Sequence, residues 1–131
     1  MILDTDFLIA IQTETEGGLE LAAEIELQSV PKRIPSIVLQ ELYGGVGAGD
    51  DPTNNVSTYE GLVENEQIVP LNENIARRAG SLEGRHLVDE EKPNLGPADA
   101  IVAATGLVYN EPVVTSDDDF RHVRGLAVEP V

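Results

Sequence analysis

Residues 98–120 read ADAIVAATGLVYNEPVVTSDDDF, a long apolar segment followed by a short one, with carboxylates beside both. The first segment, 98–109, is nearly free of charged side chains and predicts a helix that is buried on all sides. Pro112–Thr115 is β-branched and lies between turn formers, which predicts a strand. A buried helix that leads directly into a buried strand is typical of a parallel α/β sheet, so this stretch decides the fold class.

The rest of the chain continues this alternation of strands and helices. We expect strands at 2–4, near Arg33–Ile34, at 68–71 and at 126–128, and helices at 7–12, 18–29, 36–43, 56–65 and 72–87. Ser36 is the expected N-cap of the helix at 36–43, and the glycines at 44–49 predict a flexible loop after it. The pattern predicts an α/β fold in a single domain over residues 1–131, with a parallel sheet covered on both faces.

The composition is that of a globular chain with an extreme excess of acid. Of the 131 residues 41% are hydrophobic, and 24 Asp and Glu against 8 Lys and Arg give a formal net charge of −16. Such a surface repels itself and nucleic acid in dilute salt, whereas molar salt shortens the screening length to ~3 Å. We therefore expect a halophilic protein from a salt-accumulating archaeon, and an ordinary acidic protein of a mesophile is the alternative.

Three absences in the sequence narrow the class of protein. There is no cysteine, which excludes disulfides and thiolate metal sites. There is no apolar run of 18 residues, and no basic segment precedes the apolar residues after Met1, so neither a membrane span nor a signal peptide is expected. We expect a cytoplasmic protein that does not contact a membrane.

Four acidic residues stand in apolar stretches where a buried chain normally carries Val or Leu: Asp4, Glu41, Asp99 and Asp117. A carboxylate beside a buried segment is unfavourable unless it is paired or bound to a metal. Asp4 and Asp117 follow expected strands, and the carboxyl ends of parallel strands meet at one edge of a sheet. Two carboxylates about 4 Å apart repel by ~4 kcal/mol at an effective dielectric constant of 20, so four that converge would need a cation.

Hard oxygen ligands select Mg²⁺ or Mn²⁺. One or two such ions can lower the pKa of a bound water and clamp a phosphodiester for in-line attack. Each of the four acids also has a plainer explanation. Asp4 and Asp117 would be turn residues, Glu41 a solvated helix position and Asp99 only an N-cap. The shared cation site is the hypothesis that explains all four together.

Further polar residues stay open between a site role and a structural one. We expect Asp6 to be a helix N-cap rather than a metal ligand. Asp119 fits a ligand and a structural residue equally well, and Asp118 is expected to be exposed. His86 and His122 have no partner pattern and are expected to be structural.

Basic residues are the candidates for contacts with an RNA backbone. The candidate phosphate contacts are Arg77, Arg78, Arg85, Arg121 and Arg124. Arg77 and Arg78 have the alternative of merely covering a helix surface. The glycines at 44–49 are not followed by Lys-Ser or Lys-Thr, so they are not a P-loop.

Four stretches of the chain resemble the motifs of one nuclease family. ILDTDFLIA at 2–10, LQEL at 39–42, DAIVAATG at 99–106 and VVTSDDDF at 113–120 resemble those of the PIN-domain nucleases, and within that family the VapC-type toxins. The resemblance spans the chain in order. It implies a three-layer α/β/α fold with a central, mostly parallel sheet of four to five strands. It also implies a metal-dependent endoribonuclease, a homodimer, and inhibition by a small cognate antitoxin.

The resemblance also assigns roles to individual residues. Asp4 and Asp99 match the principal metal ligands, and Glu41 and Asp117 complete the acidic site. Thr115 and Asp119 are implied as supporting residues. Asp6 departs from the family, which more often has a small polar residue there, and so does the glycine-rich segment after Glu41.

Three alternatives remain open on the sequence. Within the PIN family the protein would be an RNA-processing nuclease, or a scaffold that binds RNA or protein without catalysis. Outside it, DTDFL at 4–8 is similar to the first motif of the haloacid-dehalogenase phosphatases, with Asp117-Asp118 as a last acidic motif. The absence of a lysine near this last motif argues against the phosphatase hypothesis.

Overall fold

Five short parallel strands form the centre of the molecule. The computed structural model describes residues 1–50 and 52–131, and within them the strands pair in the order β3-β2-β1-β4-β5. The strands are β1 (Ile2–Leu3), β2 (Arg33–Pro35), β3 (Gln67–Val69), β4 (Val113–Thr115) and β5 (Val128–Pro130). All four pairings between neighbouring strands are parallel, so the carboxyl ends of the strands lie at one edge of the sheet.

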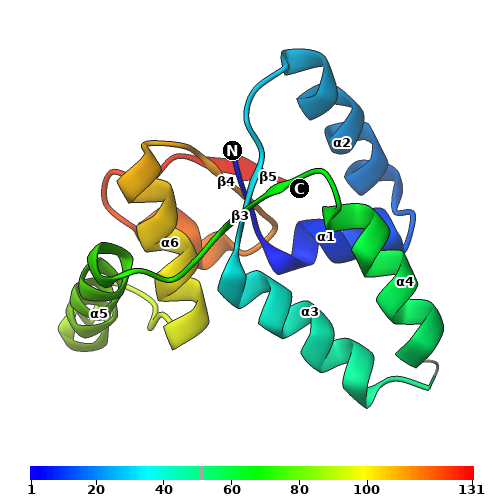
Figure 1. Ribbon diagram of the computed structural model, residues 1–131. Coiled ribbons are helices and arrows are strands. Elements are labelled where there is room, and N and C mark those ends of the chain that lie inside the picture. The colour runs from blue at the N-terminus through cyan, green and yellow to red at the C-terminus, as the bar shows by residue number, and fades with distance from the viewer. Residues whose placement is uncertain (51) are drawn as a thin grey trace.

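Helices cover both faces of this sheet (Figure 1). α5 and α6 lie on one side of the strands, and α1 to α4 lie on the other. The helices are α1 (Thr5–Gln12), α2 (Glu16–Gln28), α3 (Ser36–Ala48), α4 (Pro52–Val63), α5 (Glu73–Val88) and α6 (Pro97–Tyr109), with a 3₁₀ helix η1 (Asp118–His122). The expected three-layer α/β/α fold with a parallel sheet of four to five strands is confirmed.

α6 is the central helix of the core, as its apolar sequence predicts. It begins at Pro97, which needs no N–H partner in the first turn, and residues 100 and 102–106 are buried. A side chain at Gly106 would meet Leu126 Cδ1 at 2.7 Å and Val113 Cγ2 at 3.0 Å. Glycine at this position therefore lets the C-terminal part of α6 approach β4 closely.

Two expectations about the region after β2 are wrong. Residues 44–48 are not a loop, because α3 continues to Ala48. Leu42 and Val46 lie one turn apart and are both buried, so packing holds the helix through its glycines. Ser36 is not an N-cap: Pro35 holds that position, and the Ser36 hydroxyl accepts a hydrogen bond from the Leu71 amide at 3.2 Å.

Two strands begin and end away from their expected positions. β3 is Gln67–Val69 and ends before Leu71, and β5 is Val128–Pro130 rather than 126–128. The amide of Leu126 bonds the Val123 carbonyl at 3.2 Å, so the chain is still turning where the strand was expected. The pairing of Val113 with Val128 then sets the register.

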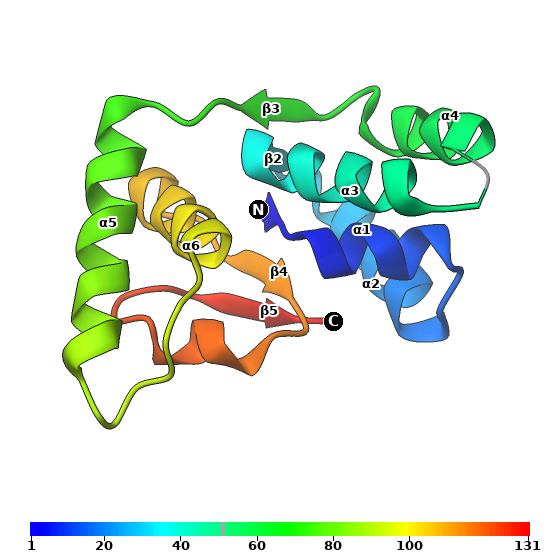
Figure 2. The ribbon, with the colours of Figure 1, turned by 90° about the horizontal axis from the view of Figure 1, so that it is seen from below.

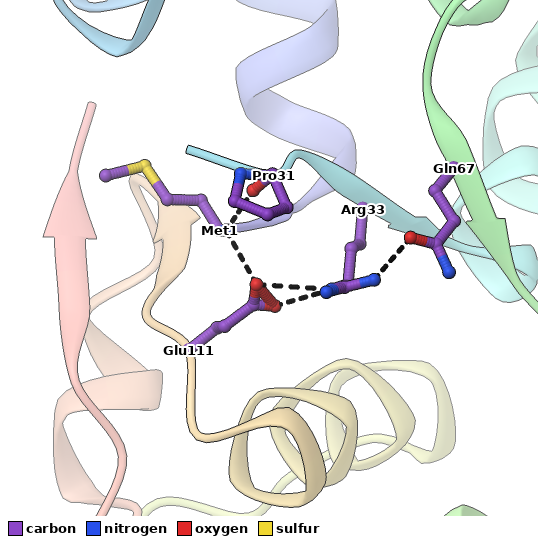
Figure 3. Close-up of polar contacts among 5 residues, drawn as sticks. All are labelled: Met1, Pro31, Arg33, Gln67 and Glu111. Atoms are coloured by element: carbon purple, nitrogen blue, oxygen red, sulfur yellow. Dashed lines mark hydrogen bonds and ion pairs between the residues drawn. The ribbon is translucent and has the colours of Figure 1, made fainter. Parts of the chain in front are cut away.

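Charged groups at the amino ends of the strands compensate one another (Figure 3). The Met1 amino group donates to the Pro31 carbonyl at 2.6 Å and to Glu111 at 3.3 Å. Arg33 forms an ion pair with Glu111 at 2.7 Å and also donates to the Gln67 side chain. Glu111, the acid at this edge, is therefore paired with two cationic groups. The carboxyl edge of the sheet carries acids without such partners, as described below.

No helix in the described ranges is both long enough and apolar enough to cross a membrane.

Candidate functional site

Asp4 is the most buried acid at the carboxyl edge of the sheet. It directly follows β1 and is the N-cap of α1, with Oδ1 accepting from the Thr5 amide at 2.8 Å. Its Oδ2 accepts from the Thr115 hydroxyl at 2.9 Å, and the residue is only 6% exposed. Burial, and then the charge of Asp6, raise the pKa of Asp4 to about 7, against the partial opposition of the Thr5 and Thr115 hydrogen bonds.

Asp6 is not an N-cap, contrary to expectation. Asp4 holds the cap position, so Asp6 falls in the first turn of α1. Its Oδ2 accepts from the Ser116 amide at 2.8 Å, from the Ser116 hydroxyl, and lies 3.1 Å from the Thr115 hydroxyl. Its Oδ1 is buried and has no hydrogen-bond partner. A buried carboxylate oxygen without a partner is unfavourable by ~1–3 kcal/mol or more, so this oxygen is suited to a ligand that supplies positive charge.

Asp99 lies in the first turn of α6 and faces the same edge. It is not the N-cap, because Gly96 holds that position. Burial raises the pKa of Asp99 to about 6, and the charges of Asp117, Glu41, Asp119 and Asp6 add to this in decreasing order. The structure therefore brings the carboxylates of four separate segments within electrostatic reach of one another.

Glu41 and Asp117 border the buried acids from two sides. Glu41 is exposed, so its apolar neighbours in the sequence do not enclose it, and its Oε1 accepts from the Thr5 hydroxyl at 2.9 Å. Asp117 is half-buried and is the N-cap of η1, with Oδ1 accepting from the Asp119 amide at 2.9 Å. Asp118 is exposed, as expected, and pairs with Arg121 at 3.1 Å.

Hydroxyl groups at the strand ends hold these carboxylates in place. Thr115 is 1% exposed, contacts both Asp4 and Asp6, and accepts from the Asp117 amide at 3.1 Å. Thr5 and Ser116 have similar roles and were not among the predicted residues. Only their position in the sequence could have indicated this role. Each lies within two residues of the end of a strand, next to an acid of the site.

Carboxylate oxygens are the ligand type that a hard divalent cation prefers. Within the described ranges, however, no group of three or more His, Asp or Glu side chains is arranged so that it could hold a metal ion. The charge is nevertheless unbalanced, because none of the ion pairs there involves Asp4, Asp6, Glu41, Asp99, Asp117 or Asp119. Raised pKa values and an unpartnered carboxylate oxygen are what acidic cation ligands show when no cation compensates them.

The five candidate arginines do not form one surface. Arg77 pairs with Glu73 on α5, and Arg121 pairs with Asp118. Arg78, Arg85 and Arg124 line a cavity between α5, α6 and the segment after η1. His86 is buried in the wall of that cavity, whereas His122 is exposed on η1.

A five-stranded parallel sheet with uncompensated carboxylates at the carboxyl ends of its central strands defines an α/β protein with an acidic edge site. The family model of the PIN domain matches residues 1–126, and the chain belongs to this family. Family membership gives no support to the phosphatase alternative.

Solved structures with the same fold come from toxin–antitoxin complexes. One chain of VapBC2 from Rickettsia felis, bound to a DNA fragment from its promoter, superposes with a TM-score of 0.84 at 22% identity, over 99% of this chain and 97% of that one. A chain of DNA-bound VapBC from Salmonella typhimurium has the same score and identity, with 98% and 96% covered. A chain of VapBC-5 from Mycobacterium tuberculosis superposes with a TM-score of 0.69 at 26% identity, over 99% of this chain and 95% of that one. No curated protein sequence matches this chain.

Proposed function

We propose that this protein is a metal-dependent endoribonuclease and the toxin of a toxin–antitoxin pair. Membership in the PIN family and similarity to chains of VapBC complexes support the class. The observation that carries the proposal is the uncompensated acidic edge, where Asp4 is buried with a pKa of about 7 beside Asp6 and Asp99. A fold with no use for a cation would gain stability by replacing such an acid.

Within this proposal Asp4 and Asp99 hold Mg²⁺ or Mn²⁺, and Glu41 and Asp117 complete the site. One or two bound ions supply a water of lowered pKa and neutralise charge on the phosphodiester. The protein orients the ligands: Thr115 fixes Asp4 and the Asp117 backbone, and Thr5 fixes Glu41. Asp4 must give up its proton to act as a ligand, which its pKa of about 7 permits near neutral pH.

A cleavage assay tests the activity. Purified protein is incubated with end-labelled RNA and with DNA of the same sequence, in Mg²⁺, in Mn²⁺ and in EDTA. We expect RNA to be cut internally with either ion and to remain intact in EDTA. Cleavage in EDTA would remove the metal from the proposal. Metal binding without cleavage of any RNA would favour a non-catalytic scaffold.

We also propose a small antitoxin as the inhibitory partner. Its basic side chain would enter the carboxylate cluster and replace the charge of the metal. A hollow of about 230 Å³ between α1, α2 and α4 offers a surface for the rest of such a segment. Its lining includes the apolar Phe7, Ile11 and Ala22 and the charged Glu26, Lys32 and Glu66. We expect expression alone to arrest growth, and co-expression of the adjacent small gene to relieve it. Harmless expression of the active enzyme would favour an RNA-processing role instead.

A homodimer and a halophilic, cytoplasmic setting complete the proposal. Sedimentation at high KCl measures the oligomeric state directly. A monomer at all concentrations would reject the dimer without affecting the assignment of the acidic edge.

A further inference from the structure

The basic side chains of this protein divide into two groups. Four of the 8 Lys and Arg residues form ion pairs with carboxylates: Lys32, Arg33, Arg77 and Arg121. The other four, Arg78, Arg85, Lys92 and Arg124, have no ion pair with any described residue, and all four line one cavity. Although the chain has 24 acidic residues, its unpaired basic side chains are therefore concentrated around this one cavity.

The cavity has a volume of about 330 Å³ and is formed by α5, α6, the loop between them and the segment after η1. Arg78 and Arg85 are two turns apart on α5 and therefore share a face. Lys92 comes from the loop between α5 and α6, and Arg124 from the segment after η1, which passes beside the C-terminal half of α5 (Figure 2). Leu82 and Leu107 provide apolar wall, and no acidic residue is among the lining residues.

His86 gives a second, independent indication of a ligand. It lines the same cavity and is 1% exposed. Its Nδ1 lies 2.9 Å from the Pro93 carbonyl oxygen, which can only accept, so Nδ1 donates. Its Nε2 is buried and has no partner, which for a buried polar atom calls for an explanation.

We infer that this cavity is a phosphate-binding pocket for a nucleotide, here a nucleotide unit of the RNA strand; the RNA assignment rests on the proposed function. Arginine forks match phosphate oxygens, and the two leucines suit the apolar part of a nucleotide. The volume lies within the usual range for small-ligand sites. A chain with a net charge of −16 repels RNA as a whole, so a local group of cations is needed to hold the strand.

The pocket and the acidic edge are joined by η1. Asp117 caps the start of this helix, and Arg124 follows its end. Five residues of 3₁₀ helix rise roughly 10 Å, a span that a few nucleotides can bridge. A strand anchored in the pocket would thus extend toward the carboxylates.

Two variants that each make the net charge more negative by two test the pocket. Arg85→Gln/Arg124→Gln removes two cavity cations, and Leu27→Glu/Gln28→Glu adds two carboxylates at exposed positions of α2, on the other side of the sheet from α5 and α6. Both change the net charge equally. Binding of AMP and of a 5′-labelled RNA is measured by titration in EDTA at one fixed KCl concentration, so no cleavage is required. We expect the cavity variant to lose at least ~10-fold in affinity for both probes, and the control variant to stay within about twofold.

The outcomes separate the pocket from the nuclease. Displacement of RNA by AMP assigns the pocket to the strand, whereas AMP binding without displacement assigns it to a free nucleotide. Absence of AMP binding, or equal losses in both variants, would overturn the inference, even if the protein cleaves RNA. The expected pattern without any RNA cleavage would support the pocket and reject the nuclease. As a further readout, AMP should shift the imidazole signals of His86.

Discussion

The hydroxyl of Thr115, at the end of β4, lies 2.9 Å from Oδ2 of Asp4, the residue after β1, although the two residues are 111 apart in the chain. The same hydroxyl lies 3.1 Å from Asp6 Oδ2. A hydroxyl has one proton and can fully donate to only one of these carboxylates at a time. The hydroxyl therefore cannot fully stabilise both charges, and burial of Asp4 together with the charge of Asp6 keeps the pKa of Asp4 raised to about 7.

The metal-free protein should lose stability as pH rises from about 4 to 7. Asp4 ionises near 3.8 when unfolded and near 7 when folded, so between these values the folded state binds the extra proton. The full shift corresponds to at most about 4 kcal/mol, lost progressively over that range and constant above it. Urea unfolding in EDTA and high KCl at pH 5 and pH 8 measures the difference. Asp4→Asn should reduce this difference and leave the smaller share of Asp99, whose pKa is raised to about 6, whereas Asp118→Asn should change it little. An unchanged pH dependence in Asp4→Asn would contradict the burial of this charge.

Asp4→Asn and Asp99→Asn should each reduce RNA cleavage at least ~100-fold, which is ~2.7 kcal/mol of barrier. Each change removes the charge of a proposed metal ligand with little change of shape. Initial rates on end-labelled RNA in Mn²⁺ measure the effect. Asp118→Asn is the matched control, because Asp118 lies in the same acidic run and is exposed. Full activity in both site variants, with folded protein, would reject the assignment.

Thr115→Val should lower cleavage roughly 10-fold or more, while Thr115→Ser should stay near the wild type. Valine keeps the shape but removes the donor to Asp4 and the acceptor for the Asp117 amide. The metal concentration needed for the half-maximal rate is compared between the variants. A variant whose ligands are mispositioned needs more metal, whereas a variant that is partly unfolded loses rate at every metal concentration. If serine and valine behave alike, the hydroxyl is not what holds the site.

Mn²⁺ or Mg²⁺ should raise the melting temperature of the wild type by several degrees. A cation that binds only the folded state adds ~2.7 kcal/mol at a hundredfold excess over Kd. Melts are compared at fixed, high KCl so that general screening is constant. Asp4→Asn/Asp99→Asn should respond much less and should be more stable than the wild type without metal. A less stable double variant with the full metal response would show that these residues are only structural.

Stability and cleavage should both increase with KCl. The acidic side chains that give the net charge of −16 repel one another, and the unpaired carboxylates at the acidic edge add to this repulsion. Salt screens both contributions. Thermal melts and rates from 0.1 M to 3 M KCl test this, with NaCl as a second salt. A protein that is most stable and active at about 0.1 M salt would refute the halophilic expectation and leave the acidic edge unaffected.

The part of the fold that follows from local patterns was predictable. An apolar stretch such as 98–109 has no stable position except a buried helix, and strands alternating with helices require a parallel sheet with both faces covered. Asp4 and Asp117 could be placed at one edge because they follow strands, and parallel strands end on the same side. Positions that depend on packing were not predictable: residues 44–48 are helical because Val46 is buried, although their glycines favour a loop.

The sequence by itself determined the layered fold, the acidic edge and the excess of negative charge, because these follow from hydrophobic period, strand direction and composition. Only the tertiary structure decided which polar groups meet. It made Asp4 rather than Asp6 the cap of α1, joined Thr5 to Glu41, and left Asp6 Oδ1 and His86 Nε2 without partners. It also separated the paired arginines from the unpaired ones. Such contacts join segments up to 111 residues apart, and their geometry depends on how the helices pack, which no local pattern encodes.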